Sequence, residues 1–324
     1  MTQEPADGRV ARRRRSREPL GAAAGGRVEY PRMGYLPGRH PRKLSRGTKA
    51  PLPAAVLSQA VYNSEFGHLF RSDCLQVLPL VRAASIDTVF ADPPFNLGKD
   101  YGKRIDDRRS ESDYIDWCKA WLSHCVRVLR PGGSLFVYNL PKWNILLGAF
   151  LAQEQMEFRH WISIEMSACL PIPGRLHPSH YGLLYFTKGK PTTFRRIRTP
   201  IAKCRHCGGE IKDYGGHRAA MNPKGVTLKD VWSDIPPVRH WKFKSKSRRA
   251  NALSTKILER VIEMSTVPGD VVLDPFGGSG TTFVVCERKR RYWIGVEIGS
   301  CAQIVERLTT GSIEFHSNED YVED

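Results

Sequence analysis

The sequence predicts an α/β fold of the doubly wound type, and three observations lead to this prediction. Two apolar, strand-like runs, at residues 86–91 and 270–273, each end in a turn that core packing alone does not require. The first turn consists of Asp92, Pro93, Pro94 and Phe95. The second consists of Asp274, Pro275, Phe276, Gly277, Gly278, Ser279 and Gly280. Amphipathic helical stretches alternate with further short apolar runs, which is the pattern of a sheet covered by helices.

The remaining elements follow in chain order. Residues 68–73 are predicted to form a short strand ending at Asp73. From Asp113 to Leu129 apolar residues recur at helical spacing, which indicates a helix packed on the core. An Arg-Pro-Gly-Gly turn and a strand at 134–138 are predicted next, and residues 253–262 are predicted to form a helix just before the strand that leads into the glycine-rich turn.

The glycine-rich turn has the composition of a ligand-binding loop. Its glycines permit backbone angles closed to other residues and allow a ligand to approach the main chain. Residues 281–285 then begin a helix with free N–H groups, and the strand at 292–296 ends at Glu297. This acid lies 17 residues after Gly280, close to the offset of roughly 20 residues expected for a carboxylate that binds ribose hydroxyls. A strand, glycine turn, helix, strand and acid in this order predict a nucleotide-type ligand.

Together the two turns resemble the signature motifs of the DNA amino-methyltransferases. These enzymes move a methyl group from S-adenosylmethionine to the exocyclic nitrogen of adenine or cytosine. The resemblance covers roughly residues 55–310, and the order of the motifs, catalytic turn first, is similar to that of the permuted β class. It implies a Rossmann-like, S-adenosylmethionine-dependent methyltransferase fold that is circularly permuted and carries an inserted target-recognition region.

The resemblance assigns the first turn to catalysis. Two consecutive prolines make a rigid turn with exposed carbonyl groups. The Asp92 carboxylate and the Pro93 carbonyl are each expected to accept one hydrogen of the target amine, and Phe95 is expected to stack on a base flipped out of the duplex. An aspartate at the first position favours adenine N6, because cytosine-N4 enzymes more often have serine there. Cytosine N4 therefore stays open as an alternative.

Cofactor contacts are also carried over by resemblance. Asp274 is expected near the positively charged sulfonium, and Asp73 near the adenine, although Asp73 could equally cap the helix that follows it. Ser254 and Lys256 begin the helix before the glycine strand, where a solvated helix face is the competing interpretation. The predicted cofactor-binding residues are Asp73, Ser254, Lys256, Asp274, Phe276, Gly278, Gly280, Thr281 and Glu297.

The net charge of +17 is concentrated in two segments. Residues 1–50 contain 13 Lys or Arg against 4 Asp or Glu, and residues 188–250 contain 17 against 4, so the rest of the chain is mildly acidic. We interpret 1–50 as a disordered basic tail, 51–187 as the catalytic half, 188–250 as a DNA-binding insert and 251–324 as the cofactor-binding half. A solvated charged face is the alternative for the second basic run. The DNA-binding candidates are Arg195, Arg196, Arg198, Arg239, Lys242, Lys244, Lys246, Arg248 and Arg249.

The eight scattered cysteines indicate reduced thiols and a cytoplasmic location. Cys204 and Cys207 resemble one knuckle of a zinc ribbon, but four ligands are needed and no second CxxC exists, so His206 or His217 would have to contribute. The sequence contains no apolar run of 18 residues, so no transmembrane helix is expected.

The main prediction is a site-specific methyltransferase of double-stranded DNA. Methylation of RNA and non-catalytic DNA binding are the alternatives, and a homodimer or a cognate restriction enzyme is left open.

Overall fold

A computed structural model describes residues 50–97, 109–165, 173–174, 176–201, 203–204, 207–210, 215–217, 220–235 and 253–310. Within these residues a nine-stranded sheet forms the centre of the fold. Its strands, in spatial order, are β1 (Tyr62–Asn63), β2 (Gly67–Arg71), β11 (Tyr292–Glu297), β10 (Val271–Asp274), β3 (Ile86–Ala91), β4 (Leu129–Asn139), β6 (His180–Thr187), β5 (Glu157–Glu165) and β9 (Val231–Trp232).

The five strands from β2 to β4 run parallel to one another, whereas β6 is antiparallel to both of its neighbours. The strand before the glycine turn, β10, lies directly beside β3, the strand before the Asp-Pro-Pro-Phe turn. Leu273 pairs with Val89, so both strands end at the same edge of the sheet. Since β3 comes early in the chain and β10 late, this adjacency confirms the permuted order predicted from the sequence.

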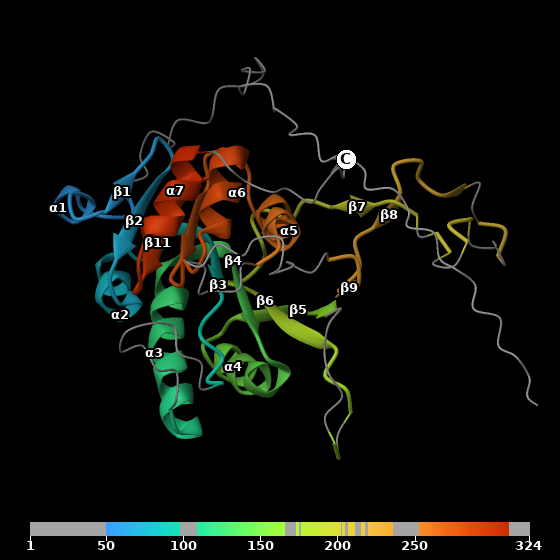
Figure 1. The fold of residues 1–324 in the computed structure, drawn as a ribbon, viewed down its shortest axis with the longest axis horizontal. Helices are drawn as coiled ribbons and strands as arrows, with labels where there is room; N and C mark the ends of the chain where they lie inside the picture. The colour runs from blue at the N-terminus through green and yellow to red at the C-terminus, as the bar shows by residue number, and fades with distance from the viewer. Residues whose placement is uncertain are drawn as a thin grey trace, which may run out of the picture. The chain divides into compact units, whose positions relative to one another are not determined.

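Helices cover both faces of the sheet (Figure 1). They are α1 (Ala54–Leu57), α2 (Cys74–Val77), the 3₁₀ helix η1 (Leu78–Leu80), α3 (Glu111–Val128), α4 (Pro141–Gln153), α5 (Thr255–Ser265), α6 (Thr281–Lys289) and α7 (Ala302–Thr310). One hydrophobic core joins α2, α3 and α4 to one face, and a second joins α5, α6 and α7 to the other. Alternation along the strands explains the two cores, because Val89 and Leu135 face the first and Phe90 and Phe136 the second.

The predicted insert is joined to this sheet. Its strand β9 pairs in parallel with β5 at the sheet edge, and the Trp232 side chain is buried in the second core. Two further short strands, β7 (Arg198–Thr199) and β8 (Val226–Thr227), form an antiparallel pair of their own. The segment therefore packs on the sheet through β9 and forms a separate ribbon through β7 and β8.

The predicted helices and strands are all present, with ends shifted by a few residues. The turn predicted at residues 130–133 is wrong, because these residues lie within β4. The helix predicted at 113–129 is α3, and its apolar residues Tyr114, Trp121 and Cys125 are buried as expected. Among the described helices none has the combination of length and apolar character needed to cross a membrane. The predicted tail at 1–50, except for residue 50, lies outside the described residues.

Candidate active site

Polar side chains gather where the parallel strands end. Asp274 and Glu297 close β10 and β11, Asp92 follows β3, and Asn139 closes β4. The backbone N–H of Ser72, just after β2, donates to the Glu297 carbonyl oxygen at 3.1 Å, which brings neighbouring Asp73 to the same edge. The parallel sheet therefore unites both motifs at its carboxyl edge, the usual position of ligand sites in such folds.

The turn predicted to be catalytic, Asp92 to Phe95, is called the catalytic turn below, and it is held by hydrogen bonds to two of its carbonyl oxygens. The Tyr114 hydroxyl donates to Pro94 at 2.7 Å, and Trp143 Nε1 donates to Phe95 at 2.8 Å. Tyr114 in turn accepts a hydrogen bond at 3.0 Å from Asn139, whose side chain is fully buried. In the described part of the chain the Pro93 carbonyl oxygen accepts no hydrogen bond. The turn is thus fixed at the two carbonyls that directly follow the one assigned to the target amine by the sequence analysis.

A further contact fixes the end of the turn. Asn96 has a positive φ of 56°, a conformation that asparagine tolerates better than most residues. Its side-chain oxygen accepts from the Arg109 backbone N–H at 2.8 Å, and its amide donates to the Arg109 carbonyl oxygen at 3.0 Å. Asn96 therefore ties the catalytic turn to the residue before the N-cap of α3.

Phe95 belongs to a cluster of three aromatic rings beside Asp92. Its ring centroid lies 6.0 Å from that of Tyr138 and 5.6 Å from that of Tyr181, and these two tyrosines are 5.1 Å apart. Burial raises the pKa of Tyr138, and the negative charge of Asp92 raises it further, so this hydroxyl stays protonated beside the carboxylate. The cluster offers flat apolar faces and two tyrosine hydroxyls next to the catalytic turn.

The glycine turn is shaped by close packing against α7. Gly280 has a φ of 78°, and a Cβ atom there would lie 2.8 Å from Ile304 Cγ2. At Gly278, whose φ is 53°, a Cβ would meet no atom nearer than the Phe276 carbonyl oxygen at 3.8 Å. The guanidinium of Arg307 donates to the Ser279 carbonyl oxygen and so fixes the turn from the α7 side. Gly280 therefore allows the close packing against α7, whereas Gly278 leaves open space above the main chain.

The two carboxylates at the ends of β10 and β11 differ in their surroundings. Asp274 is buried, accepting hydrogen bonds from the Phe276 N–H at 2.9 Å and the Thr282 hydroxyl at 2.5 Å. Burial raises the pKa of Asp274 to about 7; the charge of Glu297 adds to this, and the two hydrogen bonds oppose it. Glu297 accepts from the N–H groups of Gly278 and Gly299 at 2.7 and 2.6 Å, and burial raises its pKa.

The first turn of α5 meets the glycine turn, because the Thr281 hydroxyl donates to the Leu253 carbonyl oxygen at 3.4 Å. Ser254 occupies the N-cap position but makes no side-chain capping bond. The hydroxyl groups of Ser254 and Thr255 are buried and, among the described residues, have no hydrogen-bond partner. The alternative of a solvated helix face is wrong, since α5 is buried along its whole length. Two unpartnered buried hydroxyls beside a glycine turn indicate a polar ligand.

Three predicted cofactor residues have internal partners. Lys256 Nζ lies 2.8 Å from Asp234 Oδ2. Asp73 caps α2 by accepting a hydrogen bond from the Leu75 N–H at 2.9 Å, so the capping role is present whether or not Asp73 also reaches a ligand. Phe276 packs edge-on against Trp121, with ring centroids 5.0 Å apart.

The residues at this edge fit S-adenosylmethionine. Glu297 retains acceptor capacity for hydroxyl groups, Gly278 leaves the main chain open, and the α5 hydroxyls lack partners. Asp274 gives a carboxylate whose ionised form a nearby cation would stabilise. Glu297 as an acceptor for hydroxyl groups and the open glycine turn match a ligand with a ribose. The carboxylate of Asp274 matches the positive charge of the sulfonium.

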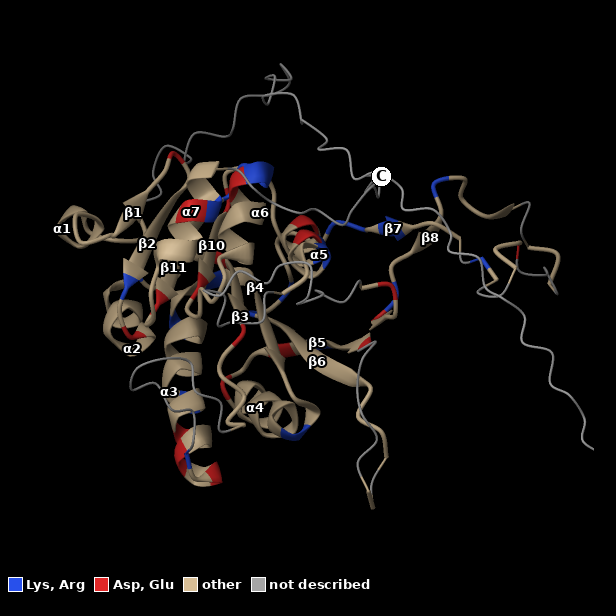
Figure 2. Cartoon of the chain, viewed as in Figure 1, with Lys and Arg blue, Asp and Glu red and all other residues tan. Residues whose placement is uncertain are grey.

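Only part of the predicted DNA-binding set can be placed. Arg195 is ion-paired with Glu263 at 2.5 Å, Arg198 donates to the Gly225 carbonyl oxygen at 3.1 Å, and Arg196 is exposed. Figure 2 shows basic and acidic residues interspersed on α3, α5 and α6. The other candidates lie outside the described residues, namely Arg239, Lys242, Lys244, Lys246, Arg248 and Arg249.

The zinc hypothesis is not tested by the geometry. Cys204 and Cys207 lie in a tight turn in which the Gly208 N–H donates to the Cys204 carbonyl oxygen at 2.9 Å. His206 lies outside the described residues, and in the part that is described no group of three or more metal-ligating side chains forms a metal site. Zinc therefore stays a prediction.

Sequence reasoning missed several residues of this edge. Tyr114 and Trp143 have the periodicity of core residues, and nothing in the sequence reveals that their polar atoms reach the catalytic turn. Asp234 lies in the insert, 22 residues before Lys256. Thr255 could have been found from its position next to Ser254, whereas the contact of Arg307 with the glycine turn depends on the packing of α7.

The permuted sheet, with a glycine turn and an Asp-Pro-Pro-Phe turn at one edge, defines a Rossmann-like, S-adenosylmethionine-dependent methyltransferase fold. A solved PvuII DNA methyltransferase, described as cytosine-N4-specific, shares this fold with a TM-score of 0.54 and 21% identity, covering 74% of this chain and 85% of that one. Residues 86–306 match the model of the N6/N4 family, described as DNA methylase. The chain therefore belongs to the N6/N4 DNA methylase family, and the predicted family is confirmed.

Two curated relatives are type II methyltransferases. M.BamHI of Bacillus amyloliquefaciens is 55% identical over 248 residues, covering 76% of this chain and 58% of the relative. M.HpaI of Haemophilus parainfluenzae is 33% identical over 236 residues, covering 71% of this chain and 69% of the relative. The chain thus spans somewhat more than half to about two thirds of the length of these relatives.

Proposed function

We propose that this protein is a site-specific DNA methyltransferase that moves a methyl group from S-adenosylmethionine to the exocyclic amine of a base flipped out of double-stranded DNA. The observation that carries the proposal is the adjacency of β3 and β10, which brings the Asp-Pro-Pro-Phe turn and the glycine turn to one sheet edge. Membership of the DNA methylase family supports it.

The catalytic turn acts on the target amine by positioning. The lone pair of an exocyclic amine is delocalised into the base ring, so the amine is a poor nucleophile. The Asp92 carboxylate accepts one amine hydrogen and the Pro93 carbonyl the other, which favours a tetrahedral nitrogen with a directed lone pair. Because Tyr114 and Trp143 hold the neighbouring carbonyls, this acceptor pair is fixed before the base arrives.

Phe95 and its neighbours receive the base. The ring of Phe95 and those of Tyr138 and Tyr181 provide apolar faces beside Asp92 on which a flipped base can stack. Stacking offsets part of the cost of unpairing and holds the base plane while the turn orients its amine. Pro94 lies between Pro93, which accepts from the amine, and Phe95, which stacks on the base, and it keeps the turn rigid.

The cofactor is held by the predicted residues at the ends of β10 and β11 and at the start of α5. Glu297 accepts from the ribose hydroxyls, the main chain near Gly278 lies against the ligand, and the hydroxyls of Ser254 and Thr255 bind its polar atoms. Bound S-adenosylmethionine supplies the electrophilic methyl group. Asp274 contributes negative charge near the sulfonium.

Adenine N6 is the first candidate target, because the turn begins with aspartate. Cytosine N4 is the second candidate, since its amine has the same two hydrogens and the same conjugated nitrogen, and the same acceptor pair serves both. The segment 188–250 is proposed to read the target sequence, with its basic residues on DNA phosphates. The separate ribbon of β7 and β8 supports a role for this segment outside the catalytic body.

The test is methyl transfer from labelled S-adenosylmethionine to unmethylated double-stranded DNA, followed by nucleoside analysis. Labelled N6-methyladenine supports the first candidate, and labelled N4-methylcytosine supports the second. Absence of transfer to any duplex by protein that binds the cofactor would overturn the proposed activity. Transfer to structured RNA in the same assay would identify the alternative substrate.

A further inference from the structure

The insert is attached to α5 near both of its described ends. At its start, the Arg195 backbone N–H donates to the Met264 carbonyl oxygen at 2.8 Å, and the Arg195 guanidinium lies 2.5 Å from Glu263. Near its other end, Asp234 is bonded to Lys256 and Arg260. Insert residues therefore contact α5 in its first turn, its middle and its last turn.

The contact at Asp234 joins one carboxylate to two buried cations. Asp234 Oδ2 lies 2.8 Å from Lys256 Nζ, while Arg260 binds both carboxylate oxygens, at 2.9 and 2.5 Å. The Arg260 side chain is 0% exposed and lies over the Trp232 ring, 5.0 Å from its centroid. Partial burial tends to raise the pKa of Asp234, but the hydrogen bonds from Arg260 and Lys256 lower it to about 2. Asp234 thus carries the counter-charge that these two cations need in the interior.

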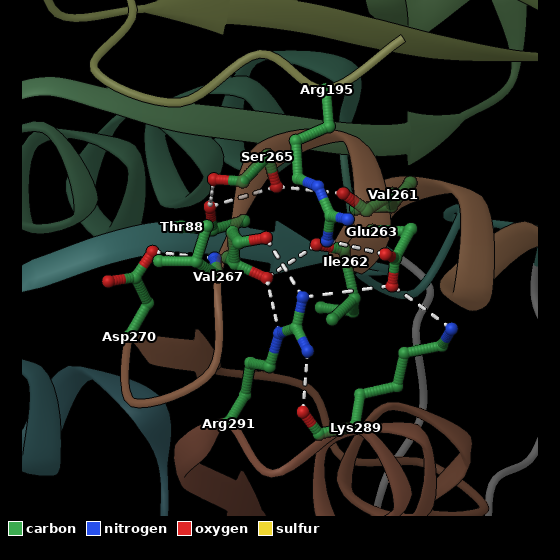
Figure 3. Close-up of polar contacts among 11 residues, drawn as sticks. Thr88, Arg195, Val261, Ile262, Glu263, Ser265, Val267, Asp270, Lys289 and Arg291 are labelled. Carbon is green, nitrogen blue, oxygen red and sulfur yellow. Dashed lines mark hydrogen bonds and ion pairs between the residues drawn. The ribbon is translucent and has the colours of Figure 1, made fainter. Parts of the chain in front are cut away.

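The contact at Arg195 belongs to a wider network (Figure 3). Glu263 also lies 3.0 Å from Lys289 Nζ and 3.7 Å from Arg291. Arg291 in turn donates to the carbonyl oxygen of Thr266 at 2.9 Å. The last turn of α5 is therefore fixed both to the insert and to the segment that connects α6 with β11.

The first turn of α5 is the part that meets the proposed cofactor site. Lys256 follows directly after Ser254 and Thr255, whose buried hydroxyls have no partner among the described residues. The resemblance assigned Lys256 to the cofactor, but its ammonium is bonded both to the Asp234 carboxylate and, at 3.2 Å, to the Asp234 carbonyl oxygen. The position of this turn therefore depends on Asp234, a residue of the insert.

We propose that Asp234 is a positioning residue that couples the DNA-binding insert to the cofactor site through Lys256 and the first turn of α5. The inference rests on the proposed function of the two sites. DNA contacts that move the insert change the placement of Ser254 and Thr255 and so change cofactor affinity. By linkage, the cofactor changes DNA affinity by the same factor.

The first test measures binding of S-adenosylhomocysteine to the full chain by calorimetry, without DNA. Asp234→Asn frees Lys256 from its carboxylate partner. If Asp234 positions the turn, the variant binds about tenfold more weakly, within the range of coupling between sites. If Lys256 itself contacts the cofactor, the variant binds equally well or more tightly, and the proposal is overturned.

Companion variants separate positioning from loss of folding. Asp234→Glu keeps the carboxylate and is expected to recover most of the affinity. Lys256→Met leaves the pairing of Asp234 with Arg260 intact, so it is expected to fold even if Asp234→Asn does not. Because loss of a direct contact between Lys256 and the cofactor would also weaken binding, this variant is judged by the coupling to DNA and not by its affinity alone. Arg288→Gln is the matched control, because Arg288 pairs with Glu259 of α5 at 3.4 Å from α6 rather than from the insert.

The second readout is the coupling itself. The affinity for S-adenosylhomocysteine is measured with and without a DNA duplex of mixed sequence, and the two affinities are expressed as a ratio. This ratio is expected to differ from one in the wild type and in Arg288→Gln. In Lys256→Met it is expected to approach one. A wild-type ratio of one, or a ratio unchanged in every folded variant, rejects the coupling. Failure of the wild type to bind S-adenosylhomocysteine at all would instead reject the proposed function.

Discussion

The hydroxyl group of Tyr114 donates a hydrogen bond to the carbonyl oxygen of Pro94 across 2.7 Å, joining the core helix α3 to the catalytic turn. Tyr114 also accepts a hydrogen bond from Asn139, so β4, α3 and the turn after β3 are linked in a chain. Such a chain fixes a carbonyl group without touching the substrate. Its effect should therefore appear in turnover rather than in cofactor binding.

Tyr114→Phe is expected to lower kcat while leaving the KM for S-adenosylmethionine nearly unchanged. The loss of the hydroxyl leaves the buried Asn139 amide without this acceptor, which destabilises the fold by about 1–3 kcal/mol. Steady-state kinetics and urea unfolding measure the two effects. Tyr185→Phe is the control, because it removes a buried hydroxyl from β6 that faces Ser134 of β4 and not the catalytic turn. Equal losses in both variants would contradict the role of Tyr114.

Asp92→Ala is expected to bind S-adenosylmethionine normally and to lose methyl transfer. Removal of one of the two groups that hold the amine should lower kcat by about 10²–10³-fold, the loss typical of removing one preorganised polar group. Calorimetry measures cofactor binding, and single-turnover methyl transfer to DNA measures the loss of catalysis. A variant that retains wild-type transfer would disprove the catalytic role of Asp92.

Gly280→Ala is expected to be more damaging than Gly278→Ala. Both glycines have positive φ, so each substitution carries backbone strain of about 1–3 kcal/mol. At Gly280 the new Cβ would also lie 2.8 Å from Ile304, and α7 or the glycine turn must shift. Thermal unfolding should therefore show the larger loss at Gly280, whereas cofactor affinity should fall in both. The reverse order of stability would argue against the packing of α7 on this turn.

The affinity for S-adenosylmethionine is expected to rise between about pH 6 and pH 8. Burial raises the pKa of Asp274 to about 7, so this carboxyl is mostly protonated at the lower pH and mostly ionised at the higher one. A cation favours the ionised form, so binding of the sulfonium releases a proton and strengthens with pH until Asp274 is fully ionised.

The sulfonium provides the control for this pH dependence. S-adenosylhomocysteine lacks the positive charge and should show a much flatter profile over the same range, as should S-adenosylmethionine with Asp274→Asn. Calorimetry in two buffers of different ionisation enthalpy gives the number of protons released. The same slope for both ligands would place the sulfonium away from Asp274. Without ligand, the raised pKa makes the contribution of Asp274 to stability fall as pH rises from about 4 to about 7.

The sequence by itself determined the family, the fold class and the two turns. Asp92 with two prolines, and Asp274 with three glycines, are local patterns whose chemistry depends on residue type and spacing along the chain. The permuted order was also readable, because it is simply the order of the two motifs.

Only the tertiary structure decided which residues hold these turns. Tyr114 reaches Pro94 from 20 residues away, Asp234 reaches Lys256 from 22, and Arg195 reaches Glu263 from 68. A core tyrosine and one that braces a catalytic turn have the same helical periodicity, and an arginine in a basic segment has the same charge whether it meets a phosphate or a buried carboxylate. These roles arise from side-chain geometry between distant elements, which no local pattern records.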